Sequence, residues 1–159
     1  MISKSPNQLS KEQALQKLRQ YCGYQDRCHS EVREKMYSLK VPRRDHDEIL
    51  AILIEEDYVN EERFAIAYAG GKFRMKQWGR VKITYALKQK KVSGYCIKKA
   101  LKQISEEDYS ATISKLAREK YEQLKAEQWI IRKKKTLDYL LQHGFEAGLA
   151  SQFLEKLKS

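Results

Sequence analysis

The chain has 159 residues, of which 42% are apolar and 33% are charged, so it can bury a core and is not a disordered tail. Seven glycines and two prolines are too few for the turns of an all-β protein, whereas abundant Lys, Glu, Gln, Ala and Leu favour helices. The formal net charge of +11 indicates a polyanionic partner, and the alternative is a soluble basic protein without one.

Membrane and disulfide-rich classes are excluded. No apolar run approaches the roughly 18 residues that a membrane span needs, and the polar segment 1–8 is not a signal peptide. The cysteines are odd in number and lack CxxC spacing, which predicts free thiols: Cys22, Cys28 and Cys96. Cys28-His29 with His46 lacks the spacing of zinc ligands, so we expect no metal or cofactor. We expect a cytoplasmic monomer.

The first predicted helix runs from about Ser10 to Cys22, after a flexible N-terminus over residues 1–9. Ser10 and Gln13 have the spacing of a capping box. The helix carries three apolar residues on one face, Ala14, Leu15 and Leu18. Pro42 lies between the next two predicted helices, where a break is needed.

Two further long helices open later in the chain. One begins at Asn60, and its Phe64 and Ala65 share an apolar face with Tyr68, so we expect them in the core. The other begins at Ser105, a favourable N-cap. The acidic residues of its first turn complement the helix dipole: Glu106, Glu107 and Asp108.

An internal repeat relates the three parts of the chain. A pair of mostly apolar residues four apart, followed five positions later by another apolar residue, occurs three times: Val32, Met36 and Val41; Ile83, Leu87 and Val92; Thr136, Leu140 and Phe145. The residue before each last member is a plausible helix exit: Lys40, Lys91 and Gly144. The pattern predicts an all-α fold of three tandem three-helix repeats over residues 10–57, 58–104 and 105–159, in an elongated, curved array. The alternative is a single globular nine-helix domain.

The basic surplus lies in the middle repeat. Residues 58–104 carry twelve Lys/Arg against two Asp/Glu, and no acidic residue occurs from Phe64 to Ser105. Like charges four residues apart repel, and a polyanion relieves that repulsion. We therefore predict a surface that binds a polyanion such as DNA, made of Lys72, Arg74, Lys76, Arg80, Lys82, Lys88, Lys90 and Lys91, with Arg132 and Lys133 added from the third repeat. We expect that reversing Arg80 and Lys82 to Glu abolishes function without disturbing the fold.

Aromatic residues are expected mainly inside. Trp78 lies at a helix junction, where it could stack on a base but is more often packed in a core. Gly79 suits a helix exit with positive φ. The ten tyrosines are expected mostly in the core or between repeats.

No catalytic constellation is evident. The three histidines lack a paired carboxylate or thiol at useful spacing, and Gly70-Gly71-Lys72-Phe73 lacks the spacing of a phosphate loop. The basic stretch has no carboxylates for metal-dependent cleavage. We therefore expect that the protein is not an enzyme.

Two motifs resemble those of the bacterial RecX family. Residues 57–65, DYVNEERFA, resemble the family's ERFA signature. Further on, Trp78-Gly79-Arg80-Val81-Lys82-Ile83, with Leu87 and Lys91-Val92, resembles a second segment of the family. The family's glycine before the last apolar residue is Lys91 here, although Gly144-Phe145 has the expected pair. The resemblance covers roughly residues 10–155 and is specific only in the middle repeat.

The resemblance implies tandem three-helix repeats and a role as a non-enzymatic regulator of the RecA recombinase, in DNA repair, homologous recombination and the SOS response. It implies binding along the groove of the RecA filament, with contacts to single- and double-stranded DNA, and inhibition of strand exchange, ATP hydrolysis and filament growth. Two other classes stay open: a helix-turn-helix-like DNA-binding protein with no recombinase partner, and an RNA-associated enzyme, which would need an acid–base pair.

Overall fold

The computed structural model describes residues 9–157, and the rest of the predicted N-terminus, residues 1–8, lies outside them. The described part is helical throughout, with one short 3-10 turn, η1 (Arg43–Asp45). The helices in chain order are α1 (Lys11–Tyr24), α2 (His29–Ser38), α3 (His46–Glu55), α4 (Glu61–Lys76), α5 (Arg80–Gln89), α6 (Gly94–Lys102), α7 (Glu106–Gln123), α8 (Trp129–Gln142) and α9 (Ala147–Glu155).

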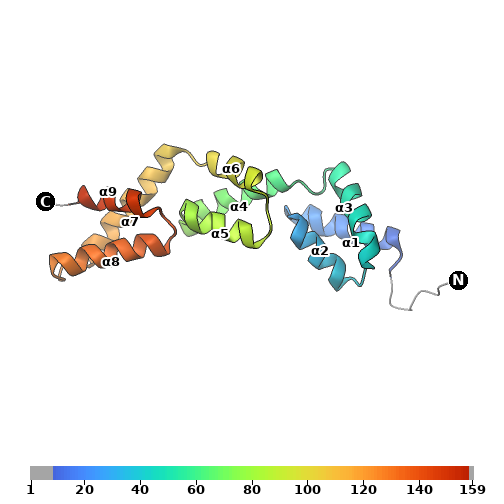
Figure 1. Cartoon of the computed structure of the whole chain (residues 1–159), viewed down its shortest axis with the longest axis horizontal. Helices are drawn as coiled ribbons and strands as arrows, with labels where there is room; N and C mark the ends of the chain where they lie inside the picture. The colour runs from blue at the N-terminus through green and yellow to red at the C-terminus, as the bar shows by residue number, and fades with distance from the viewer. Residues whose placement is uncertain (1–8, 158–159) are drawn as a thin grey trace.

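These helices form three groups of three that follow one another along the long axis of an elongated molecule (Figure 1). Helices α1–α3 form repeat 1, α4–α6 form repeat 2 and α7–α9 form repeat 3, and the main helix–helix packing is within each repeat. The predicted all-α fold of tandem three-helix repeats is confirmed, and a single globular domain is excluded. The predicted boundaries between repeats, at residues 57/58 and 104/105, fall between helices, and their exact positions stay a prediction.

The predicted helix starts are confirmed. Ser10 and Gln13 form a reciprocal capping box, with hydrogen bonds of 2.8 and 3.1 Å. Asn60 accepts from the Arg63 N–H, and Ser105 accepts from the Asp108 N–H. Such caps satisfy backbone N–H groups that have no partner inside the helix.

The repeated apolar positions form the core. Both members of each pair and the apolar residue that follows are buried in all three repeats. Thr136, the one polar member, donates its hydroxyl to the Arg132 carbonyl at 2.8 Å. As predicted, Phe64 and Ala65 are buried as well.

Two cores divide the molecule unequally. Repeat 1 has a core of its own, which Leu9 covers in part, so this last residue of the predicted flexible segment is packed. Repeats 2 and 3 share a single core, to which Cys28 is the only contribution from the described part of repeat 1. Repeat 1 therefore completes its core with its own residues and Val59, which follows the predicted limit at residue 57.

Left-handed residues end the second helix of each repeat. Lys40, Lys91 and Gly144 have φ of 60°, 62° and 93°, which confirms the predicted helix exits. Gly79 was expected to have a positive φ, but it is extended at −80°, and Gln77 takes the left-handed conformation instead. Gly79 is needed for space, because a Cβ there would lie 2.4 Å from the carbonyl carbon of Gly144.

The cysteines are free thiols in different environments. Cys22 and Cys28 are buried, whereas Cys96 is only half-buried. Burial raises the pKa of Cys22 to about 11, and burial also raises the pKa of Cys28.

We expect iodoacetamide at pH 8 to label Cys96 at least about tenfold faster than Cys22 or Cys28, because only thiolates react and buried thiols are seldom ionised. Peptide mapping over time would measure the three rates, and denatured protein, in which the rates should converge, is the control. Fast labelling of Cys22 in the folded protein would contradict the burial of this thiol.

Candidate nucleic-acid and filament interface

The acid-free stretch folds into the second half of α4, with α5 and α6. Seven of its cations are exposed and make no ion pair within the described part of the chain: Arg74, Lys76, Lys88, Lys91, Lys98, Lys99 and Lys102. We call these seven residues the free cations. The last three lie on the outer face of α6, where Lys98 and Lys102 are one helical turn apart. A surface of this kind attracts phosphates, because its own charges are uncompensated.

Two tyrosines lie on the solvent faces of the same helices. The side chain of Tyr85 on α5 is 66% exposed, and that of Tyr95 on α6 is 64% exposed. The prediction that most tyrosines pack inside is wrong: only Tyr109 is fully buried, while five are exposed, Tyr24, Tyr37, Tyr58, Tyr85 and Tyr95.

The spacing explains the error for Tyr85. Ile83 and Leu87 face the core, and a residue midway between them is turned about 160° away from that face. Aromatic rings among lysines can stack on unpaired bases. The sequence signal that could have identified Tyr85 was its place between two core positions.

Trp78 is half-buried, with part of its ring against the shared core. The ammonium groups of Lys72 and Lys82 lie 5.0 and 4.8 Å from its ring. These two predicted site residues therefore gather around an aromatic ring. Lys82 is also fixed at its Nζ, which donates to the Gln142 carbonyl at 3.4 Å.

Arg80 is engaged inside the molecule. Its guanidinium pairs with Glu106 at 2.7 Å and with Glu146 at 2.8 Å, and it lies 3.8 Å from the ring centroid of Tyr109. The Tyr109 hydroxyl donates to Glu146 and accepts from the Arg80 backbone N–H. These residues join repeats 2 and 3, so reversal of Arg80 should disturb the fold, contrary to the expectation from the sequence.

We expect Arg80→Ala to lower the free energy of unfolding by about 1–3 kcal/mol, because it leaves a half-buried carboxylate with fewer partners. Urea unfolding would measure the loss. The control is Lys76→Ala, which removes an exposed cation with no ion pair and should stay within about 0.5 kcal/mol of wild type. A loss for Arg80→Ala as small as that of the control would contradict this role.

The stability that Arg80 contributes through its pair with Glu146 should depend on pH. Burial alone would raise the pKa of Glu146, but hydrogen bonds from Tyr109 and Arg80 outweigh it and lower the pKa below 4.5. A carboxyl with a lowered pKa stabilises the fold above its unfolded pKa, and this stabilisation is lost as the pH falls through the folded pKa. The difference in free energy of unfolding between Arg80→Ala and wild type should therefore shrink below about pH 4.

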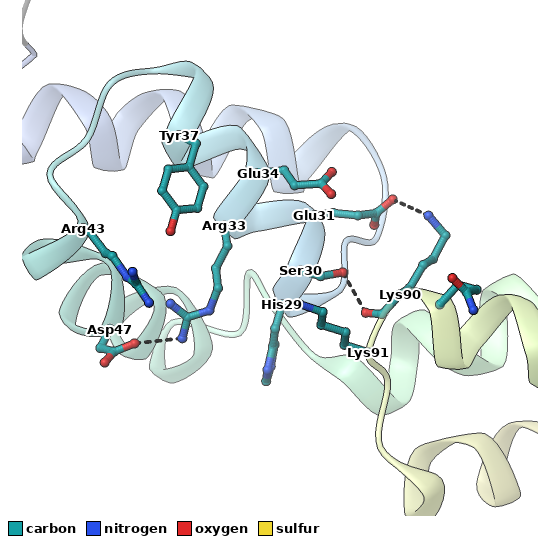
Figure 2. A pocket seen from close by; sticks show the side chains of 11 residues that line it. His29, Ser30, Glu31, Arg33, Glu34, Tyr37, Arg43, Asp47, Lys90 and Lys91 are labelled. Atoms are coloured by element: carbon teal, nitrogen blue, oxygen red, sulfur yellow. Dashed lines mark hydrogen bonds and ion pairs between the residues drawn. The ribbon is translucent and has the colours of Figure 1, made fainter.

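Lys90 belongs to the contact between repeats 1 and 2, which we call the first joint. Its ammonium lies 3.3 Å from Glu31, and its carbonyl accepts from the Ser30 hydroxyl at 2.7 Å. Figure 2 shows these groups at one end of a polar cleft, whose other end carries the Arg33–Asp47 pair at 2.8 Å. The cleft mixes both signs of charge, so it adds little to the basic surface, although Lys91 lies at its edge.

The cations predicted on repeat 3 are largely neutralised there. Lys133 pairs with Glu155 at 2.8 Å, and Arg132 lies over the Tyr121 ring and donates to the Tyr121 carbonyl. Thus, among the predicted site residues, those without an ion pair to a described residue all belong to repeat 2. The exposed lysines of α6 were missing from the predicted site because the sequence does not distinguish paired from unpaired cations.

The described residues contain no group of three or more His, Cys, Asp or Glu side chains close enough to hold a metal ion. None of their helices combines the length and the hydropathy needed to cross a membrane. What the surface of repeat 2 offers is positive charge and aromatic rings, which suit the binding of an anionic polymer.

Comparison with known proteins identifies the middle repeat. Residues 60–101 match the family model described as RecX, second three-helix domain. The chain is 30% identical over 129 residues to Regulatory protein RecX of Clostridium perfringens (strain 13 / Type A), covering 80% of this chain and 60% of that protein. The protein of the same name from Bacillus cytotoxicus is 25% identical over 138 residues, covering 87% of this chain and 51% of the relative.

Solved structures agree in fold. The crystal structure of RecX from Lactobacillus salivarius superposes with a TM-score of 0.84 at 21% identity, covering 92% of this chain and 95% of that chain. A second crystal structure, of regulatory protein RecX, superposes with a TM-score of 0.81 at 20% identity and covers 96% of this chain and 82% of that chain. The chain spans between half and three fifths of the length of the curated relatives described above. The middle repeat thus matches a RecX domain, the chain is similar to proteins named Regulatory protein RecX, and its fold is that of the solved RecX structures.

Proposed function

We propose that this chain binds the RecA–DNA filament and restrains it, lowering recombinase and ATPase activity and limiting filament growth without itself catalysing a reaction. The observation that carries the proposal is the surface of repeat 2, which exposes seven free cations and two tyrosines. The family supports it, because relatives of this chain are named Regulatory protein RecX.

The arrangement of charge suggests how contacts are divided. Repeats 1 and 3 are nearly neutral, with net charges of zero over residues 1–57 and +1 over 105–159. Repeat 2 would therefore contact DNA phosphates or acidic recombinase surface, since it holds the seven free cations and no acidic residue from Phe64 onward. The outer repeats, which extend from it in opposite directions (Figure 1), would contact successive recombinase protomers and hinder monomer addition.

Co-sedimentation with RecA filaments on single-stranded DNA tests the proposal. We expect the protein to pellet with filaments at concentrations that leave it unbound to naked DNA, and to inhibit ATP hydrolysis there. Binding should weaken steeply with salt, because phosphate contacts release counterions. Equal affinity for naked DNA and for filaments, with unchanged ATPase activity, would instead indicate a plain DNA-binding protein and refute a recombinase-directed role.

A further inference from the structure

The second helices of the three repeats lie end to end, in the order α8, α5, α2 (Figure 1). We call this arrangement the column. At the first joint, the Ser30 hydroxyl at the start of α2 donates to the carbonyl of Lys90 at the end of α5. At the second joint, the Gly79 N–H at the start of α5 donates at 2.7 Å to the carbonyl of His143 at the end of α8.

The two joints share the acceptor position, but the carbonyl that the second residue of the next helix contacts differs by one residue. Lys90 and His143 each directly follow their helix, and both provide the accepting carbonyl. Ser30 and Val81 are each the second residue of theirs, and Val81 donates at 2.9 Å to the carbonyl of Gly144. One way of joining second helices therefore occurs twice within the chain.

At one end of the column, α8 begins with three apolar residues in succession, Trp129, Ile130 and Ile131. Their side chains are 50%, 70% and 41% exposed. The corresponding starts of α2 and α5 are mostly polar: His29-Ser30-Glu31 and Arg80-Val81-Lys82. A contiguous exposed apolar group of this kind is typical of a contact surface.

The opposite end of the column carries one half-buried apolar residue, Leu39, which also packs against the core of repeat 1, between the exposed Ser38 and Lys40. Leu39 directly follows α2, in the position that Lys90 and His143 occupy in the other repeats, and Tyr37 beside it is 56% exposed. At the first joint, the third residue of α2, Glu31, pairs with Lys90. In the register of the first joint, the two ends would bring together Ile131 and Leu39, two apolar side chains.

We propose that these ends bind each other between copies, so that the start of α8 in one molecule joins the end of α2 in the next and continues the column. The occupant is a second copy because the contact repeats a joint that the chain already makes twice internally and matches apolar with apolar. Such a contact is heterologous and can propagate. It is small, so we expect weak association that grows with concentration of the otherwise monomeric protein.

Sedimentation velocity of the protein without DNA or recombinase tests this, so the result does not depend on the proposed function. Over about a hundredfold range of concentration, the mean sedimentation coefficient of the wild type should rise. Ile131→Glu alone and Leu39→Lys alone should each sediment as a monomer throughout, because each places a charge against an apolar residue. An equimolar mixture of the two variants should associate again, because the carboxylate introduced in one can then pair with the ammonium introduced in the other, as Glu31 pairs with Lys90.

Two further variants keep the test decisive. Ile130→Ser replaces the most exposed residue of the group, should leave the fold intact, and should also weaken association. Tyr95→Ser removes a comparably exposed side chain on α6 and should leave association unchanged. The proposal is refuted if the wild type stays a monomer at every concentration, if association survives Ile130→Ser, or if folded single variants fail to associate when mixed.

Discussion

Replacing Gly144 with alanine should destabilise the protein by at least about 3 kcal/mol. A Cβ at this position would lie 2.2 Å from the Cβ of Lys82 and 2.7 Å from its backbone nitrogen, and φ is +93°. Neither the backbone of α5 nor the left-handed turn can move without separating repeats 2 and 3, which share one core. Urea unfolding followed by far-UV circular dichroism would measure the loss.

Gly71→Ala is the matched control. Gly71 lies inside α4 and has no heavy atom within 4 Å of an added Cβ, so the substitution should stabilise the fold by about 0.5–1 kcal/mol. Gly79→Ala should destabilise the fold about as much as Gly144→Ala. The double variant should lose less stability than the sum of the two single losses, because both substitutions disturb the same contact. A Gly144→Ala protein as stable as wild type would show that the two turns do not touch as described.

Reversing Lys98 and Lys102 together to Glu should weaken binding to RecA filaments by about a hundredfold or more at low salt. These side chains are exposed on one face of α6 and make no ion pair within the described residues, so their reversal should spare the fold. Because about two phosphate contacts are removed, the slope of log affinity against log salt should fall by about 2. Fluorescence anisotropy of labelled filaments across salt concentrations would measure both quantities.

Lys17→Glu with Lys115→Glu provides the comparison. Both lysines are exposed, on α1 and α7, and the pair lowers the net charge by the same amount. We expect this variant to lose far less affinity, with a nearly unchanged salt slope, because its charges lie outside repeat 2. If both double variants weaken binding equally, net charge controls binding and the surface of repeat 2 is not a site.

Much of the fold could be read from the sequence, because local rules determine it. Caps such as Ser10, Asn60 and Ser105 need only their own helix, and the repeated apolar pairs report the face that each helix buries. The left-handed exits at Lys40 and Lys91 followed from alignment with Gly144. These features depend on residues a few positions apart.

The details of the site could be predicted less well, because they depend on contacts between distant segments. Arg80 meets Glu146, 66 positions away, and Lys90 meets Glu31, 59 positions away. Spacing within the chain does not reveal such pairs, so neutralised cations were placed on the predicted surface. Gly79 was assigned a turn conformation for the same reason, since its role depends on the distant Gly144.

The unequal division of the core has a consequence for how the chain unfolds. Repeat 1 has a separate core and meets repeat 2 through Cys28 and mainly polar groups, among them the pair of Arg63 with Asp26 at 2.7 Å. Repeats 2 and 3 must lose their common core together. The molecule therefore consists of two cooperative units of unequal size, and denaturation should begin with loss of the smaller, N-terminal unit while the basic surface stays folded.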